Sequence, residues 1–313
     1  MSDDRNPDSP DSASEPLSTP AGGWDFTQPI ETPSLAPAAG SAGAAAANAN
    51  GKREKANRPM TVGDKIRMGV RGVGQTLITA GLVILLFVVY EVWVTNIYAD
   101  RKQHKEQVRL AESWEGGEDP LKEAKEKLAL DPGAQVVLPA GTGFANLYIP
   151  AFGKDFAKTI VEGVDDATLE KGPGHYPKTA LPGQTGNFAV AGHRVGKGEP
   201  FLNLDRLKAG DYLIVQTYSN WFIYTVLGDT ATGDAEAVDD SGLAGRSIVA
   251  PGAVEVIAPV PNHPDQQPTR ALITLTTCHP KYTANERMII HGALSRTVPS
   301  DGDAIPTELG GTL

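Results

Sequence analysis

The sequence predicts an all-β domain, a barrel or a sandwich, that follows a single membrane-spanning helix. After about Gly141, short runs rich in β-branched and aromatic residues are punctuated by Gly and Pro, with few helical periods between them. Earlier in the chain, residues 72–90 carry no charge at all. The eight short runs are FANLYIP (144–150), TIVEGV (159–164), NFAVAGH (187–193), DYLIVQTY (211–218), WFIYTVLG (221–228), VEVIAPV (254–260), ALITLTT (271–277) and RMIIHGAL (287–294).

The composition limits the classes of function that the chain can have. A hydrophobic content of 40% is enough for a core, while 34 Gly and 24 Pro among 313 residues indicate a compact part joined to a disordered part. The formal net charge of -10 argues against general nucleic-acid binding, which needs a basic face. The single cysteine, Cys278, excludes an intramolecular disulfide and any CxxC-type zinc or redox site.

Residues 1–71 are predicted to form a disordered tail that ends in a basic cluster. The first fifty residues are rich in Asp, Ser, Pro and Ala and have no apolar periodicity, so they cannot bury enough surface to offset the entropy of ordering. The basic residues that follow are Lys52, Arg53, Lys55, Arg58, Lys65, Arg67 and Arg71.

Residues 72–96 are predicted to be a transmembrane anchor. Nineteen uncharged residues from Gly72 to Tyr90 would span roughly 28 Å as a helix, close to the thickness of a hydrocarbon core. Trp93 and Tyr98 suit an aromatic belt at the far interface. A buried helix of a soluble domain would carry a polar stripe, and a cleaved signal peptide would be shorter and nearer the N-terminus. The preceding basic cluster favours a cytoplasmic N-terminus with the remainder of the chain outside the cell.

Three further segments complete the predicted organisation. Residues 97–140 are strongly charged, and their Glu/Lys spacing predicts a stalk of solvent-exposed helices. Residues 141–298 are expected to form the β domain, in which ATLEKGPGHYP (167–177) is expected to supply one short helix, and residues 299–313 are expected to be a frayed tail.

Cys278 and Arg287 are predicted to lie at one end of the β domain. Cys278 follows the run ALITLTT, and Pro280 cannot continue a strand ladder. The next run begins at Arg287, after the eight-residue connection HPKYTANE. If the two strands pair antiparallel, the exit of the first adjoins the entry of the second.

His193 ends another β run and is followed by Arg194. It can reach the thiol of Cys278 if the two strands are neighbours and parallel. A free thiol has a pKa near 8.5 and attacks a carbonyl only as the thiolate. An imidazole can take that proton and return it to a departing amine, while an arginine can stabilise the oxyanion.

Each of these residues also has a structural interpretation. A lone cysteine at a strand end is more often a small buried apolar side chain, and an isolated histidine or arginine is more often a turn residue or an ion-pair partner. His175, His279 and His291 are competing bases. His279 is the weaker candidate of these for Cys278, because adjacent strand residues point to opposite faces.

Taken together, the segments resemble the sortase family. The resemblance covers about residues 141–298 and rests on TLTTC (274–278), on ERMIIHG (286–292) and on GPGHYPKTALPGQTGNFAVAGHR (172–194), with FLNLDRLKAGD (201–211) after the histidine. The short spacing from cysteine to arginine and the string TCHPKYTANER are most similar to class E sortases.

The resemblance implies a closed eight-stranded β-barrel and a cysteine transpeptidase. Cys278 matches the nucleophile, His193 the general acid/base and Arg287 the residue that holds substrate and stabilises the oxyanion. Thr277 matches a threonine that lines the substrate groove, and Tyr176 is a candidate pocket residue. The implied substrates are secreted proteins with a C-terminal signal of the LAxTG or LPxTG type, which is cleaved between Thr and Gly. The acceptor would be an amine of a cell-wall precursor at the outer face of the membrane, with no cofactor and no metal.

Two rival functions belong to other classes. L,D-transpeptidases also use a Cys–His pair on a β scaffold, but their cysteine follows Ser-His-Gly, whereas this chain has TTCHP. The other rival is a non-catalytic, membrane-tethered β-module for protein interaction, in which Cys278 would not react with iodoacetamide at neutral pH.

Overall fold

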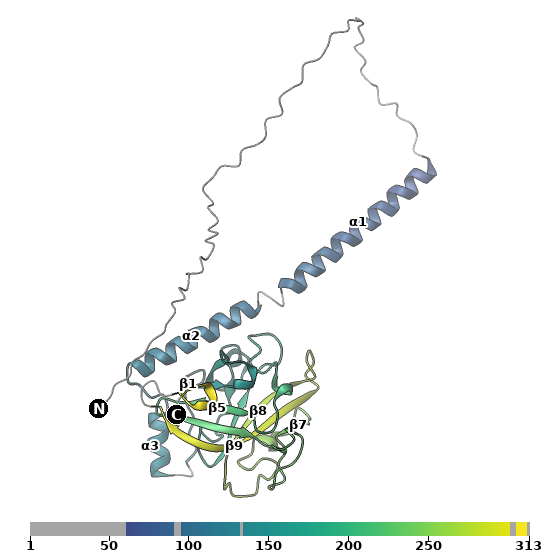
Figure 1. Cartoon of the computed structure of the whole chain (residues 1–313). Helices are drawn as coiled ribbons and strands as arrows, with labels where there is room; N and C mark the ends of the chain where they lie inside the picture. The colour runs from purple at the N-terminus through teal and green to yellow at the C-terminus, as the bar shows by residue number, and fades with distance from the viewer. Residues whose placement is uncertain (1–60, 91–94, 132–133, 301–304, 312–313) are drawn as a thin grey trace, which may run out of the picture. The chain divides into compact units, whose positions relative to one another are not determined.

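A computed structural model describes residues 61–90, 95–131, 134–300 and 305–311 (Figure 1). The predicted disordered segment, up to residue 60, and Trp93 of the predicted aromatic belt lie outside these described residues.

Helix α1 (Val62–Val89) contains the uncharged run. It begins with a capping box, in which Thr61 and Asp64 each accept a hydrogen bond from the other's backbone N–H. None of its residues is buried. Its length, and a mean hydropathy of 2.2 over its most apolar part, make it a candidate membrane span. The helix starts ten residues before the uncharged run, so Lys65, Arg67 and Arg71 lie within its first turns.

Helices α2 (Thr95–Glu115) and α3 (Lys122–Leu130) pack on the β domain and do not form a separate stalk. Helix α2 contacts strands β1 (Gly143–Tyr148) and β2 (Ala157–Glu162), and Gln107 donates to the Ala157 carbonyl at 2.8 Å. Leu121 and Ala124 are buried in the main core. The prediction of solvent-exposed helices was wrong here because the charge pattern concealed these few apolar positions.

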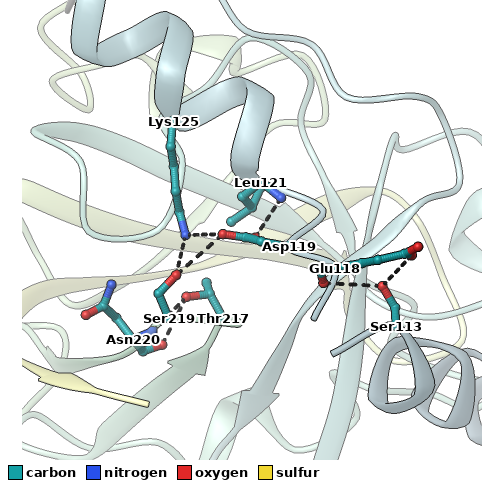
Figure 2. Close-up of polar contacts among 8 residues, drawn as sticks. All are labelled: Ser113, Glu118, Asp119, Leu121, Lys125, Thr217, Ser219 and Asn220. Carbon is teal, nitrogen blue, oxygen red and sulfur yellow. Dashed lines mark hydrogen bonds and ion pairs between the residues drawn. The ribbon is translucent and has the colours of Figure 1, made fainter. Parts of the chain in front are cut away.

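A polar cluster fixes the turn between α2 and α3 against the barrel (Figure 2). The Asp119 carboxylate accepts from the Leu121 backbone N–H at 2.9 Å and pairs with Lys125 at 2.8 Å. Lys125 also donates to the Ser219 hydroxyl at 2.9 Å, in the turn between strands β5 (Tyr212–Gln216) and β6 (Asn220–Val226). The cluster therefore joins the helical segment to the β5–β6 hairpin.

Eight strands close into a barrel, as the resemblance implied. Their order around the ring is β6-β5-β1-β2-β3-β4-β8-β9, and β9 pairs again with β6. The remaining strands of the ring are β3 (Gly174–His175), β4 (Gly186–Ala191), β5 (Tyr212–Gln216), β6 (Asn220–Val226), β8 (Ala271–His279) and β9 (Glu286–Pro299). A short helix, α4 (Asp166–Leu169), lies between β2 and β3 and confirms the expected helix in its first residues.

Strand β9 is long enough to pair with three neighbours. Along one edge it pairs with β8 over almost the whole length of that strand. Its other edge pairs first with β7 (Arg246–Val249) and then, from Gly292 onward, with β6. The first half of β9 is therefore flanked by β8 and β7, and the second half closes the ring.

The inward-facing side chains of the strands form one continuous apolar core. Phe144, Phe188, Leu275 and Ile290 are among its fully buried members. In β8 the core residues are Ile273 and Leu275, so the alternation of a strand places residues 274, 276 and 278 on the other face. This alternation decides which side chains can share a site with the thiol.

The structure differs from the sequence-based expectation in four local places. VEVIAPV is not a strand: it contains the 3₁₀ helix η4 (Val254–Ile257), and its Val256 and Ala258 carbonyls accept from the Asn187 amide. Strands β3 and β7 were not predicted. The described part of the C-terminal tail is not frayed, because Leu309 packs against a small core cluster and Glu308 pairs with Arg296 at 2.6 Å.

Candidate active site

The only cysteine lies at the end of strand β8. Cys278 is the last residue but one of β8 and is half-buried. It shares a face with Thr276 and Thr274, while Leu275 and Thr277 belong to the opposite face. The sulfur therefore belongs to the outer face at one rim of the barrel.

Arg287 is the direct cross-strand partner of Cys278 in the antiparallel pair of β8 and β9. Side chains of paired residues project to the same face, with Cβ atoms about 4.5–5.5 Å apart. Arg287 is half-buried as a residue, and its guanidinium donates, at 3.0 Å each, to the carbonyls of Ala284 and Glu286 at the start of β9. The hairpin therefore brings Cys278 and Arg287 together, as predicted.

His193 reaches the same rim from the other side of β8. Strand β4 runs parallel to β8, and the last pair in their register is Ala191 with Thr276. The Gly192 N–H donates to the Thr276 carbonyl at 3.0 Å, which carries the alignment one residue further. The condition of neighbouring parallel strands is therefore met, and the same register extended by two residues would bring His193 level with Cys278.

The predicted groove residue Thr277 has a structural role in this arrangement. It is only 3% exposed, and its hydroxyl donates to the Gly192 carbonyl at 2.7 Å. Thr277 lies on the face of β8 opposite to the thiol. It ties the segment before His193 to the strand that carries the thiol.

Tyr176 lies on the same face as the thiol. Its hydroxyl is 3.0 Å from the Thr276 hydroxyl, and its backbone N–H donates to the Ala189 carbonyl of β4. Thr276 precedes Cys278 by two residues and shares its face. The Tyr176 ring is half-buried there, beside the strand end that holds the sulfur.

The surroundings of His193 favour its neutral form. Burial lowers the pKa of its imidazole below the ordinary value, and the positive charge of Lys197 lowers it further. The carboxylates of Asp166 and Glu170 oppose this effect. In the described part of the chain the Nε2 atom of His193 is buried and has no hydrogen-bond partner.

The competing histidines are engaged elsewhere. The ring of His175 is buried, with Nδ1 2.6 Å from Glu162 and Nε2 2.9 Å from the Thr179 hydroxyl. His291 is buried in the barrel wall, where its Nδ1 is 2.9 Å from the Thr274 hydroxyl. Among the described residues, no group of three or more His, Cys, Asp or Glu side chains could hold a metal ion.

Comparison with known proteins identifies the family. A family model described as a sortase domain matches residues 147–295. Sortase SrtE2 of Streptomyces coelicolor is 34% identical over 244 residues, which cover 75% of this chain and 85% of the relative. The chain belongs to the sortase family. Sortase SrtE1 of the same organism is 32% identical over 236 residues, covering 73% of this chain but only 58% of that longer relative.

A solved sortase shares the fold of the barrel. The SrtF sortase from Corynebacterium diphtheriae aligns with a TM-score of 0.51 and 39% sequence identity, and the alignment covers 58% of this chain and 98% of that structure. Sortases are cysteine transpeptidases, which accords with a thiol, an imidazole and a guanidinium at one rim of the barrel.

Sequence reasoning did not anticipate the burial of one arginine beside this site. Arg194 follows His193 directly and is 3% exposed, although arginine is rarely buried without a partner. The string AGHR contains it, but nothing in the string indicates burial. Its partner, Asp205, lies eleven residues further along the chain, so only the folded arrangement reveals the pair.

Proposed function

We propose that this protein is a membrane-anchored sortase that cleaves a C-terminal sorting signal between Thr and Gly and transfers the new carboxyl end to a cell-wall amine. The observation that carries the proposal is the register of three strands. Arg287 pairs directly with Cys278, and the β4–β8 alignment leads His193 to the same level. The resemblance to class E sortases supports a LAxTG-like or LPxTG-like signal.

In the first half-reaction, the Cys278 thiolate attacks the threonine carbonyl carbon. The oxyanion that develops is stabilised by the Arg287 guanidinium, which keeps its charge at all physiological pH values. The C–N bond to glycine then breaks, and the His193 imidazolium gives its proton to the departing amine. The product is a thioester between Cys278 and the sorted protein.

In the second half-reaction, an acceptor amine attacks the thioester carbonyl. His193 takes the proton that the amine loses, an amide bond forms, and Cys278 leaves as the thiolate. The lowered pKa of His193 suits this base role near neutral pH.

The helix α1 supports membrane anchoring. Both proposed substrates, the sorted protein and the wall precursor, are held at the outer face of the membrane. An enzyme tethered to the same membrane meets them at a raised effective concentration. In this proposal the basic residues before the uncharged run stay in the cytoplasm, and residues 95–313 lie outside the cell.

The test uses the full chain in detergent micelles with a fluorogenic peptide that contains LAETG or LPETG, together with a primary amine. We expect cleavage between Thr and Gly, a thioester on Cys278 detectable by mass spectrometry, and a ligated product. Cys278→Ala should lose all three, and so should His193→Ala, while His263→Ala at an exposed site should retain them. Cleavage that persists in Cys278→Ala would refute the proposal.

A further inference from the structure

Arg194 contacts the chain neighbours of the proposed catalytic residues. It follows His193 directly, and its Nη1 atom donates to the Met288 sulfur at 3.3 Å and lies 3.4 Å from His279 Nδ1. Met288 follows Arg287, and His279 follows Cys278. One guanidinium therefore meets the segments that carry all three functional groups.

Asp205 completes this arrangement from a fourth segment. Its Oδ1 atom is 3.1 Å from Arg194 Nη2, and its Oδ2 atom is 3.6 Å from Lys281 Nζ, three residues after Cys278. Asp205 lies in the 3₁₀ helix η3 (Leu204–Arg206), whose Leu204 is fully buried. The carboxylate therefore links the loop after His193 to the connection after Cys278.

The guanidinium of Arg194 lies on the opposite side of the sheet from the sulfur. Its contact Met288 is paired with Thr277 and belongs to the main core, whereas Cys278 and Arg287 belong to the outer face. Arg194 is therefore separated from a substrate at Cys278 by the sheet itself. Any effect of Arg194 on the reaction therefore has to act through the positions of the residues that it contacts.

The energetics argue against a role in packing alone. Burying the Arg194 charge is costly, and its ion pair with Asp205, whose side chain is 41% exposed, is partly screened by solvent. Arg194 adds to this cost, since its buried Nε atom has no partner in the described part of the chain. What the planar guanidinium provides is a fixed orientation of several contacts at once.

We infer that Arg194, held by Asp205, is a positioning residue that sets the placement of His193 relative to Cys278 and Arg287. The inference rests on the proposed function of these three residues. A displacement of about 1 Å in a reacting group can lower a rate by about 100-fold, so a clamp on all three segments acts mainly on kcat. Substrate affinity depends on other side chains and changes little.

The experiment compares variants of the full chain in detergent micelles. Arg194→Met removes the charge at similar volume, Arg194→Lys keeps the charge without the fork, and Asp205→Asn removes the carboxylate. The matched control is Arg270→Met. Arg270 directly precedes the first residue of β8, at the end of the strand far from Cys278, and its ion pair with Asp239 has a distance of 2.8 Å.

With the sorting peptide, we expect Arg194→Met to lower kcat about 10- to 100-fold with KM within about threefold. Arg194→Lys should recover part of the loss, Asp205→Asn should be intermediate, and Arg270→Met should stay within about twofold of the unaltered protein. The inference is overturned if the kcat of Arg194→Met is no lower than that of Arg270→Met. If Arg194→Met does not fold, the same comparison is made with the milder Asp205→Asn.

A second measurement does not depend on any peptide substrate. The rate at which iodoacetamide alkylates Cys278 is followed against pH, because a nearby imidazole changes the thiolate population. We expect Arg194→Met to shift this profile in the same direction as His193→Ala, and Arg270→Met to leave it unchanged. An unshifted profile in Arg194→Met, or in His193→Ala, overturns the positioning role. Absence of peptide cleavage by the unaltered protein would instead refute the proposed function.

Discussion

Cys278 and Arg287 occupy opposite positions in the last pairs of the β8–β9 ladder. Their proximity is set by backbone register and not by the conformation of the loop between them. Leu275 and Ile290 are paired with each other in the same ladder, and both are buried in the core. A slip of one residue would turn these side chains to the other face, so their burial fixes the register. The barrel core thereby determines the geometry of the rim.

The position of Arg287 predicts that its planar shape matters as well as its charge. Arg287→Lys keeps the charge but loses the fork that can hold a carbonyl oxygen in one orientation, so we expect kcat/KM to fall about 10- to 100-fold. Arg296→Lys, toward the other end of β9, is the matched control and should stay within about twofold. An Arg287→Lys enzyme with the rate of the control would remove Arg287 from the mechanism.

The charges around His193 predict a shift of its titration. Lys197 lowers the pKa of the imidazole, so Lys197→Gln should raise that pKa, whereas Lys208→Gln, at an exposed site elsewhere, should leave it unchanged. The measurement is the NMR titration of the His193 ring protons. Because the interaction is between partly exposed groups, the difference should shrink at 1 M salt. A lower pKa in Lys197→Gln would contradict this prediction.

The buried ring of His291 predicts that the protein loses stability on mild acidification. Burial lowers the pKa of His291 to about 4, against the attraction of Asp239, while the unfolded chain has the ordinary value near 6.5. The contribution of the neutral, buried His291 ring to the free energy of unfolding is therefore fully present above pH 6.5. Below that, the unfolded chain takes up a proton that the folded chain does not, and the loss reaches on the order of 3 kcal/mol near pH 4.

Equilibrium unfolding of the His291→Gln variant between pH 4 and 7 tests this dependence. The slope of unfolding free energy against pH should be smaller than in the unaltered protein. A remainder should persist, because the pKa of His193 is lowered as well. His263→Gln, at an exposed position, should keep the full slope. An unchanged slope in His291→Gln would show that this ring is not the source.

The docking of α3 predicts different costs for two leucines of the helical segment. Leu121 is 2% exposed within the main core, so Leu121→Ala should lower the unfolding free energy by about 2–5 kcal/mol. Leu130, at the end of α3, is 90% exposed, and Leu130→Ala should change it by less than about 0.5 kcal/mol. Urea unfolding measures both. Equal effects would contradict the docked position of α3.

The polar cluster beside Leu121 should contribute less to the free energy of unfolding than its number of contacts suggests (Figure 2). The Lys125 side chain is 37% exposed, so its ion pair with Asp119 is partly screened by solvent. Lys125→Met is expected to cost no more than about 1 kcal/mol in the same urea experiment. A loss as large as that of Leu121→Ala would show that the cluster, and not apolar burial, holds the helices in place.

The single thiol predicts a direct assay of membrane orientation. If residues after the span are outside the cell, a membrane-impermeant maleimide should label Cys278 on intact cells. Cys278→Ala cells provide the control, since the sequence contains no other cysteine. Labelling that requires permeabilised cells would reverse the proposed orientation.

The placement of Cys278 beside Arg287 was predictable because it depends only on neighbouring strands. A hairpin alone brings Arg287 to Cys278, and this needed only two β runs and a short connection. The approach of His193 depended on a parallel β4–β8 pair, which the sequence left as a condition. Thr277 could not be placed from sequence, because the choice between lining a groove and bonding to Gly192 depends on which face points inward.

The errors in the fold have local physical causes. VEVIAPV has the apolar alternation of a strand, but its carbonyls at Val256 and Ala258 are bound by the Asn187 side chain, a contact across 69 or 71 residues. Strand β3 has two residues and lies in a Gly- and Pro-rich segment, so no periodicity marks it. The packing of α2 and α3 rests on a few buried side chains among many charges.

The closed ring has a consequence for how the molecule opens. Strands β4, β8 and β9 each have a hydrogen-bonded neighbour on both sides, so none can peel away as an edge strand. Local opening is cheapest where few such bonds must break. The backbone amides of β8 and of the middle of β9 should therefore exchange with deuterated water only when the whole barrel unfolds, while those of β7, which has a single neighbour, should exchange earlier. The rim that carries Cys278 and Arg287 is built on these strands, so it should keep its register during every smaller fluctuation.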